Sequence, residues 1–379
     1  MINIIKKLTV FLVIFFILIE FFSYIASKHE LLVKNETPAL YGGVKISESV
    51  RFNRTEEKPW GAWRRTNHKS NQVSSCFNVN FYTNEIGARD SSFKNLNSNS
   101  IFLLGDSFAE GFGVDIKKTA QYFLEEKLNT DILNFGTSQT FGPLQELIIY
   151  KEYKNKYKHN GIIVFVLPAN DFNDNDQLHW AKIDKKRYRP YFNLEGDPLV
   201  PYYFPEAKKA SFDFENPSLK MKILEFLKDN LWLTNMIRSI RALAMYSSSN
   251  EKIPGYYRFT ETNLNKIKQI NVIKSYTEIA RLSGGIDVLF VTIPSQAGIN
   301  YYKKTKKPNL YKKSIWYKEF NNLSKKKNIF YLDLMDSIPN NHDKLFLECD
   351  GHWSETGNKW ASEEIFKVID SNNIFNKKN

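Results

Sequence analysis

The sequence IFLLGDSF, residues 101–108, joins a short apolar run to a polar turn that contains a glycine and a serine. A continuous apolar run such as 101–104 is typical of a strand that is buried on both faces of a parallel sheet. In open α/β sheets, functional sites form just beyond the carboxyl ends of the strands. The stretch therefore predicts a buried strand that ends at Gly105 and presents Ser107 on a tight turn before a helix.

Similar apolar runs recur along the chain and alternate with helical stretches. This alternation predicts an α/β layered fold with a parallel sheet and right-handed crossovers. The gap at about 172–260 is too long for one crossover, so we interpret it as an insertion that holds aromatic residues and a helix at 219–245. Further strands are expected at 131–134, 161–167, 286–293 and 329–332, and helices at 120–128, 144–157, 264–282, 310–325 and 356–369.

Polar residues and glycine also follow the later strands. Gly136 comes after the second strand, Asn170 after the third, and Asp350 and His352 lie beyond the fifth. A serine hydroxyl becomes a good nucleophile when a base lies within hydrogen-bond reach and a third group orients that base. The strand ends therefore predict the parts of a nucleophilic hydrolase, with the serine first in the chain and the histidine last.

These motifs resemble, in order, the blocks of the SGNH (GDSL) hydrolase and acyltransferase superfamily. The matching residues are GDSF at 105–108, Gly136, Asn170 and the D-x-H motif at 350–352. The resemblance covers about residues 99–370, and the stretch 84–90 is similar to the lead-in of envelope-associated members. It implies a flavodoxin-like three-layer parallel sheet and an esterase or O-acyltransferase activity.

The resemblance also implies a role for each motif residue. Ser107 would be the nucleophile, His352 its base, and Asp350 the acid that orients the imidazole. The N–H groups of Ser107 and Gly136 and the amide of Asn170 would stabilise the oxyanion. Each residue also has an ordinary structural role: a helix cap for Ser107 and Asp350, a surface histidine for His352, a turn for Gly136 and an Asx turn for Asn170.

Two positions depart from the pattern of the superfamily. Pro168 stands where the third block usually has glycine. Many members place the acid three residues before the histidine, where this chain has Cys349, and the aspartate here is two residues before it. Secreted polysaccharide acetyltransferases that resemble the family also use D-x-H. The motif therefore points towards carbohydrate acyl groups and leaves the identity of the acid open.

The N-terminus contains an apolar run, LTVFLVIFFILIEFFSYI at 8–25, in which Glu20 is the one charge. The run is long enough to cross a bilayer as a helix. It is interpreted first as an uncleaved anchor, with a cleaved signal peptide and a buried core helix as alternatives; Tyr24 fits a cleavage site poorly. Lys6 and Lys7 precede the run, so the positive-inside rule places the rest of the chain outside the cytoplasm, in the periplasm or at the cell surface.

The overall composition is that of a globular protein, with 42% apolar and 25% charged residues. Lysine and arginine exceed aspartate and glutamate by 53 − 41 = 12, which suits anionic surroundings. The extracytoplasmic location makes nucleic acid an unsuitable partner. The only cysteines, Cys76 and Cys349, exclude a disulfide-rich scaffold and can pair in an oxidising compartment. No residues have metal-ligand spacing and no phosphate loop occurs, so neither a metal nor a cofactor is expected.

Together these features predict three segments. They are an anchor at 1–27, a linker and small N-terminal layer at 28–98, which is irregular or β-rich, and a catalytic domain at 99–379. The expected function is a membrane-anchored serine esterase or O-acyltransferase that acts on acyl groups, acetyl above all, of envelope polysaccharide. The alternatives are a lipase-like or lysophospholipid esterase and a catalytically silent glycan-binding module. Hydrolysis or transfer, and the oligomeric state, are left open.

Overall fold

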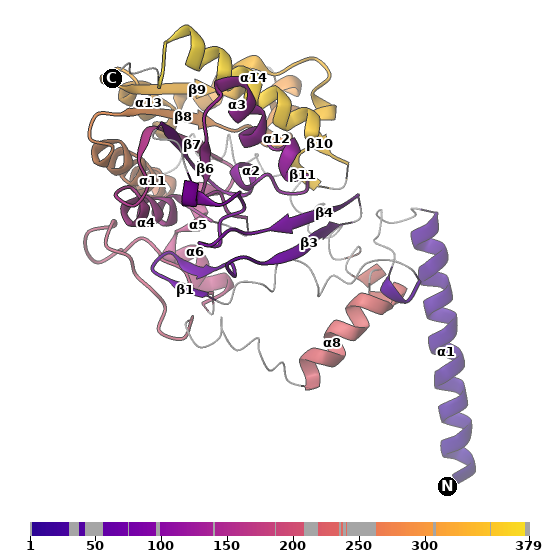
Figure 1. The fold of residues 1–379 in the computed structure, drawn as a ribbon. Coiled ribbons are helices and arrows are strands. Elements are labelled where there is room, and N and C mark those ends of the chain that lie inside the picture. The colour runs from indigo at the N-terminus through magenta and orange to yellow at the C-terminus, as the bar shows by residue number, and fades with distance from the viewer. Residues whose placement is uncertain are drawn as a thin grey trace.

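The chain is described as a computed structural model, in which an α/β body lies beside one long, separate helix, α1 (Ile2–Lys28) (Figure 1). The structure describes residues 2–29, 38–41, 56–74, 76–95, 99–138, 141–185, 187–207, 219–234, 236–237, 240, 263–305, 308–348 and 350–375.

The body is built on a five-stranded parallel sheet with the order β6-β5-β7-β8-β9. All residues of β5 and β8 are buried, which explains why their sequences are apolar without alternation. The predicted α/β fold and its five strands are confirmed. The strands are β5 (Ser100–Leu104), β6 (Ile132–Asn134), β7 (His159–Val166), β8 (Asp287–Thr292) and β9 (Ile329–Asp333).

The strand order places β5 between β6 and β7. The chain therefore leaves β5 towards one side of the sheet and returns to its other side at β7. This reversal is a topological switch point, the position at which open α/β sheets form their binding crevices. Ser107 and Asn170 follow the two strands that meet there.

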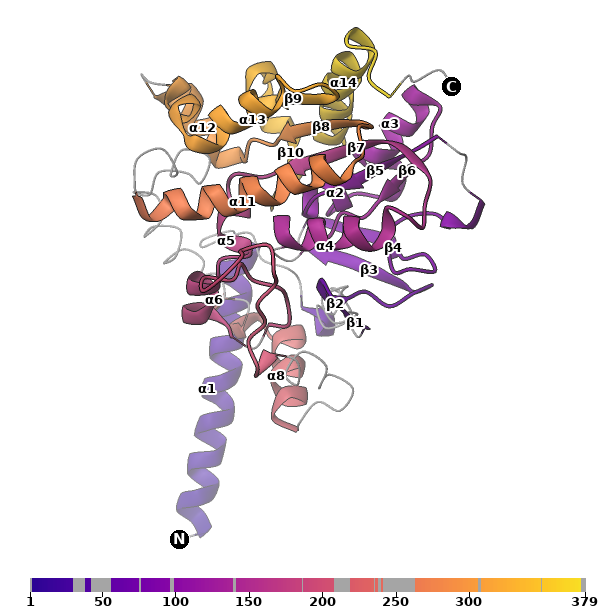
Figure 2. The same cartoon turned by 90° about the vertical axis from the view of Figure 1, so that its left-hand side faces the viewer.

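Helices cover both faces of the sheet and complete the predicted three layers (Figure 2). On one face α11 packs against α4 and α13, and on the other α14 packs against α3. One predicted helix, 310–325, is divided, because Ser314 caps α13 by accepting a hydrogen bond from Tyr317 N–H. The helices are α3 (Ala120–Leu128), α4 (Pro143–Tyr153), α11 (Asn263–Leu282), α12 (Gln296–Lys304), α13 (Ile315–Leu323) and α14 (Glu355–Ser371).

The N-terminal layer contains two antiparallel hairpins. Its aromatic residues Trp60, Trp63 and Phe93 are buried in the same hydrophobic core as the sheet. The layer is therefore packed on the body rather than linked loosely to it. Its strands are β1 (Glu56–Lys58), β2 (Gly61–Trp63), β3 (Lys69–Ser74) and β4 (Phe77–Tyr82).

The insertion after β7 forms a small core of its own from Trp180, Tyr191, Phe204 and Ala207. The single helix predicted at 219–245 is wrong in its extent, because α8 ends at Asn230 and Leu231 is not helical. Residues 241–245 of that prediction lie outside the described residues. The helices described here are α5 (Asp171–Asp174), α6 (Gln177–Ile183) and α8 (Leu219–Asn230).

Helix α1 is long and apolar enough to cross a membrane, with a mean hydropathy of 2.5 over its most apolar window. Only 6% of that window is buried inside the molecule, which argues against a core helix of a soluble protein. A membrane anchor and a signal sequence both fit these properties.

Candidate active site

Ser107 is the first residue of a short helix, α2 (Ser107–Glu110), that directly follows β5. The turn between them requires Gly105, which has φ +148°; a Cβ there would lie 2.9 Å from Cβ atoms of both Ala109 and Phe165. Asp106 caps the helix, because its Oδ1 accepts a hydrogen bond from Phe108 N–H at 3.0 Å. Strand, glycine turn and cap together fix the position of the serine.

His352 and Asp350 lie on β11 (Asp350–Trp353), which pairs antiparallel with β10 (Phe346–Leu347). His352 Nε2 is 2.7 Å from Ser107 Oγ, and its Nδ1 bonds Asp350 Oδ1. Asp350 Oδ1 also accepts the backbone N–H of His352 at 3.0 Å, which holds carboxylate and imidazole together. The structure thus brings the predicted serine, histidine and aspartate into one continuous chain of hydrogen bonds.

The imidazole is held by aromatic contacts as well. The ring centroid of His352 lies 5.1 Å from that of Phe108 and 4.5 Å from that of Phe112. Its neighbour Trp353 is buried in the core and packs edge-on against Phe108. Because Phe108 follows Ser107 directly, its ring places the imidazole of His352 next to the start of α2.

The three predicted oxyanion donors differ in whether their N–H hydrogens already make hydrogen bonds within the protein. Among the described residues, Ser107 N–H makes no hydrogen bond and remains available. Asn170 Nδ2 donates to Asp106 Oδ2 at 3.3 Å, which leaves its second amide hydrogen. Gly136 N–H instead donates to Asn134 Oδ1 at 2.7 Å. The structure therefore places two of the three donors with a hydrogen free for substrate.

Gly136 has a packing role in the structure. A Cβ at this position would overlap backbone atoms of Ala109 and Glu110, so only glycine lets the loop after β6 approach α2 this closely. Its carbonyl accepts a hydrogen bond from Arg64 Nη2 at 3.1 Å. The sequence signal that selected Gly136 is thus explained by close backbone approach.

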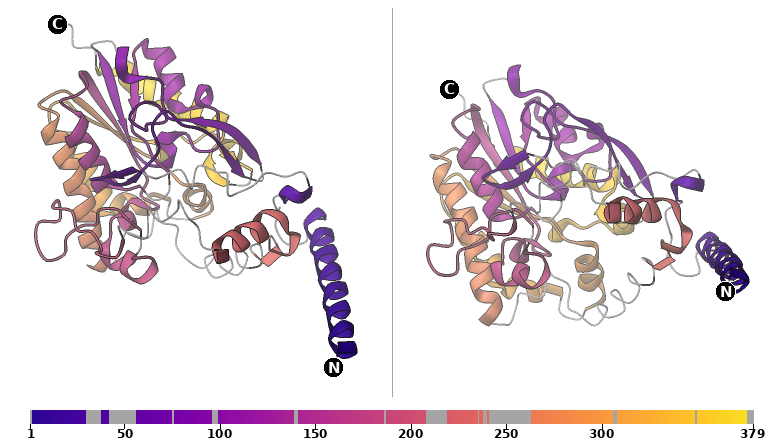
Figure 3. Two further views of the ribbon diagram at one scale, coloured as in Figure 1. Left: turned by 60° about the horizontal axis from the view of Figure 1, so that its bottom comes forward. Right: turned by 90° about the horizontal axis from the view of Figure 1, so that it is seen from below.

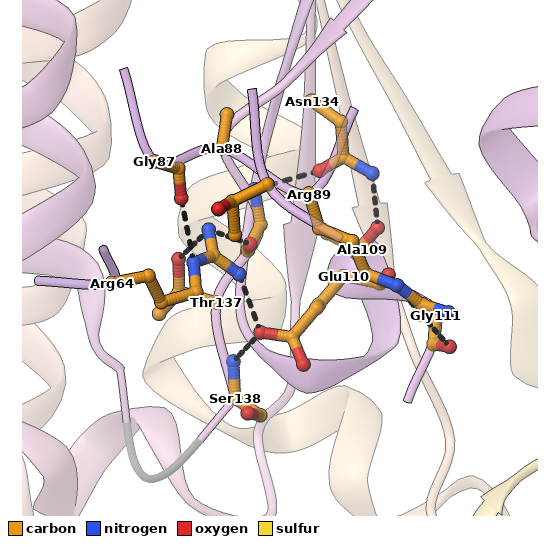
Figure 4. Close-up of polar contacts among 12 residues, drawn as sticks. Arg64, Gly87, Ala88, Arg89, Ala109, Glu110, Gly111, Asn134, Thr137 and Ser138 are labelled. Carbon is orange, nitrogen blue, oxygen red and sulfur yellow. Dashed lines mark hydrogen bonds and ion pairs between the residues drawn. The ribbon is translucent and has the colours of Figure 1, made fainter. Parts of the chain in front are cut away.

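A buried polar cluster contacts α2 (Figure 4). Most of its residues were not predicted from the sequence. Glu110 accepts hydrogen bonds from Arg64 Nη1 at 2.7 Å, Ser138 N–H at 2.7 Å and Gln72 Nε2 at 3.2 Å. Arg64 also donates from Nε to the carbonyl of Gly87. Burial lowers the pKa of Arg64, and the Glu110 charge opposes that shift.

A second buried arginine, Arg89, binds the backbone at the C-terminal end of α2. Its Nη1 donates to the carbonyls of Glu110 and Gly111, and its Nη2 donates to that of Val114. Burial lowers the pKa of Arg89 to about 10. Arg89 lies in the lead-in stretch 84–90 that the sequence singled out, whereas no signal pointed to Arg64. We call Arg64, Arg89 and Glu110 the arginine brace.

Four buried carboxyl groups lie behind the serine: Asp106, Glu146, Asp171 and Asp174. Burial raises their pKa values first, and mutual charge repulsion contributes, bringing Asp174 to about 7. Asp171 Oδ2 accepts hydrogen bonds from Tyr276 OH and Leu167 N–H, whereas neither oxygen of Glu146 has a partner. Burial therefore favours the protonated forms of these four carboxyl groups. In the described part of the chain, no three His, Cys, Asp or Glu side chains are placed to hold a metal ion.

The hairpin β3–β4 touches the site. Phe77 packs edge-on against Phe112, with ring centroids 5.5 Å apart, and Phe112 contacts the imidazole. Gln72 Oε1 accepts a hydrogen bond from Gly113 N–H at 2.7 Å. At the tip of the hairpin, Cys76 is disulfide-bonded. The other cysteine, Cys349, lies outside the described residues.

No family model and no curated protein matches the chain. Among solved structures, it is similar to a lipase/acylhydrolase from Enterococcus faecalis, with 12% identity and a TM-score of 0.37 over 72% of this chain and 96% of that one. It is also similar to a family two carbohydrate esterase from Clostridium thermocellum, in complex with cellohexaose, with 10% identity and a TM-score of 0.38 over 75% and 66% of the two chains. A lipolytic protein of the G-D-S-L family from Desulfitobacterium hafniense DCB-2 has 13% identity and a TM-score of 0.34 over 71% and 99%. At such identities and TM-scores, the function of this chain has to come from its own site.

Proposed function

We propose that this protein is a membrane-anchored serine esterase or O-acyltransferase that acts on acyl esters, chiefly acetyl, of cell-envelope polysaccharide. The observation that supports this most directly is the chain of hydrogen bonds Asp350–His352–Ser107 at the switch point of the sheet. Ser107 is 8% exposed, and the side chains of His352 and Asp350 are 25% and 29% exposed, so none of the three residues is sealed from solvent.

The geometry supports a two-step acyl transfer. Ser107 Oγ attacks the ester carbonyl carbon while its proton passes to His352 Nε2, and Asp350 stabilises the imidazolium without taking the proton. Ser107 N–H and Asn170 Nδ2 donate to the oxyanion of the tetrahedral intermediate, and loss of one such donor typically costs about 10²–10³ in rate. The alcohol leaves with the proton from His352, and an acyl-serine remains.

The second step decides between esterase and transferase. His352 takes a proton from the incoming acceptor, which attacks the acyl-serine carbonyl. His352 then returns that proton to Ser107 Oγ as the bond between Oγ and the acyl group breaks, which restores the free serine. Water as acceptor gives hydrolysis, and a sugar hydroxyl gives acyl transfer to the glycan. Both outcomes use the same residues.

Two features support an extracytoplasmic location. Lys6 and Lys7, in the first turns of α1 before its apolar run, favour a cytoplasmic N-terminus and an α/β body on the other side of the membrane. Cys76 is in a disulfide, a bond that persists in oxidising compartments outside the cytoplasm. The body would then face the periplasm or the cell exterior, where envelope polysaccharide lies.

The decisive test is labelling of the full-length protein in membranes with a fluorophosphonate probe. Wild type is expected to be labelled, Ser107→Ala to lose the label, and Ser371→Ala, a change at an exposed serine of α14, to keep it. Equal labelling of Ser107→Ala and wild type, or no labelling of correctly folded wild type, would favour a silent glycan-binding module.

Substrate class is tested separately. Because an anchored esterase also lies near lipid, a lipase-like or lysophospholipid esterase is the alternative, and esters of increasing acyl length separate the two. A preference for long chains would contradict the polysaccharide proposal. Mass spectrometry of envelope glycans from a deletion strain then assigns the direction: lost acetyl indicates a transferase and gained acetyl an esterase.

A further inference from the structure

Glu20, the one charge within the apolar run of α1, has partners from a distant part of the chain. Its carboxylate accepts hydrogen bonds from Trp232 N–H at 2.7 Å and Leu233 N–H at 3.0 Å. It is only 9% exposed, whereas most of α1 is exposed. A charged group in a membrane helix is costly unless protein groups partner it. These donors lie at the start of a helical turn, 231–234, in which only Leu231 is not helical, so this helical turn must lie at the depth of Glu20.

Aromatic side chains mark that depth. The ring of Trp232 packs edge-on against Tyr24, with centroids 5.5 Å apart, and lies 5.9 Å from Tyr41. Tryptophan and tyrosine concentrate where a membrane meets water. Glu20 lies eight residues before Lys28, or about 12 Å along the helix. The turn therefore lies where hydrocarbon gives way to headgroups.

Helix α8, which leads into this turn, exposes an apolar stripe. Leu219, Ile223 and Phe226 follow one another at helical spacing and are 74%, 50% and 60% exposed. Two lysines, Lys220 and Lys222, are exposed between them. An apolar stripe flanked by lysines is typical of helices that lie in the plane of a membrane interface. Both views of Figure 3 show α8 beside the end of α1 nearer the body, away from the central sheet.

The contact between α1 and the turn leaves a groove of about 860 Å³. Apolar side chains from both segments line it, among them Phe16, Phe21 and Leu231, and Lys28 lies at the same groove. A groove that opens on a membrane helix and ends near a lysine suits an acyl chain with an anionic headgroup.

We propose that α8 and the turn 231–234 form a second membrane contact, in which the stripe of α8 lies in the outer interface of the bilayer and a phospholipid acyl chain fills the groove. The inference rests on α1 spanning the membrane, as proposed above. Two contacts, the span and α8, then fix the tilt of the α/β body relative to the bilayer, which a single helix followed by a linker would not do.

The test uses full-length protein in phosphatidylcholine–phosphatidylglycerol vesicles with one added cysteine, and Cys76 does not compete for the label because it is disulfide-bonded. An environment-sensitive fluorophore is attached at Phe226→Cys on the stripe, at Lys222→Cys on the same helix, and at Lys359→Cys on α14 as an aqueous reference. We expect a blue-shifted emission that doxyl-labelled lipid quenches at position 226, less quenching at 222 and none at 359. In the background Glu20→Leu, quenching at 226 should be lost.

Three outcomes would overturn the proposal. The fluorophore at position 226 could show the same emission as that at position 359 while the protein resists carbonate extraction. This result would mean that α8 lies in water although α1 is inserted. A blue shift that doxyl lipid does not quench would mean that protein, such as a second copy, covers the stripe. Release by carbonate would refute the anchor and this contact together, whereas Ser107-dependent labelling reports on the catalytic proposal independently.

Discussion

Replacing Glu110 with glutamine is expected to lower the free energy of unfolding by about 3–5 kcal/mol, the usual cost of removing one partner of a buried ion pair. Arg64 Nη1, Ser138 N–H and Gln72 Nε2 all donate to the carboxylate. A glutamine keeps one acceptor oxygen and brings an NH₂ group to a place where every neighbour is a donor. Burial already lowers the pKa of Arg64, and without Glu110 no charge in the pair opposes that shift.

The measurement is urea unfolding of the full-length protein in mild detergent, followed by tryptophan fluorescence. The midpoint should fall with an unchanged slope, as expected when stability alone changes. Glu152→Gln is the matched control, because Glu152 pairs with Lys156 on the surface and such pairs contribute about 0–1 kcal/mol. A loss below about 1 kcal/mol in Glu110→Gln, similar to the control, would refute the reasoning that the brace is a closed, dry cluster.

Three further changes test the site. Asp350→Asn should lower the ester turnover of a labelled, folded enzyme by about 10³–10⁴, and an unchanged turnover would show that another group orients His352. Gly105→Ala should destabilise the protein by about 1–3 kcal/mol through backbone strain, whereas Gly351→Ala, where a Cβ meets nothing within 4 Å, should be tolerated in the same thermal melts. The carboxyl groups of Glu146 and Asp174 have raised pKa values, so the folded state keeps protons that the unfolded state releases above about pH 4. Stability should therefore fall as the pH rises above about 4, by about 1.4 kcal/mol per pH unit for each such proton, and the contribution of Asp174 should end near its pKa of about 7. Glu146→Gln should flatten that fall, and an equally steep fall in the variant would contradict the assignment.

The sheet could be predicted from the sequence because strands buried on both faces are apolar throughout. The positions of Ser107, Asn170 and His352 could be predicted because each lies beyond the carboxyl end of a predicted strand of the parallel sheet, and these ends lie at one edge. The hydrogen bond from Gly136 N–H to Asn134 Oδ1 could not be predicted, because it depends on the turn that the chain makes after β6.

Long-range contacts explain the other features that could not be predicted from the sequence. Arg64 and Glu110 are 46 residues apart, and a lone arginine or glutamate in a sequence usually indicates a solvated surface. The break of the predicted helix at Leu231 coincides with a turn whose backbone donates to Glu20, more than 200 residues earlier. No local pattern around either residue predicts the other.

The arginine brace also constrains biosynthesis. The segment 56–95 leaves the ribosome before α2, so Arg64 lacks the Glu110 carboxylate, and Arg89 lacks the Glu110 carbonyl, until α2 has been synthesised. The hydrophobic core of the sheet also needs Trp60 and Trp63, which belong to that earlier segment. Folding of α2, which carries Ser107, thus depends on residues 56–95, and a fragment that starts at residue 99 is expected to bury Glu110 without Arg64 and to be cleared by proteases rather than accumulate.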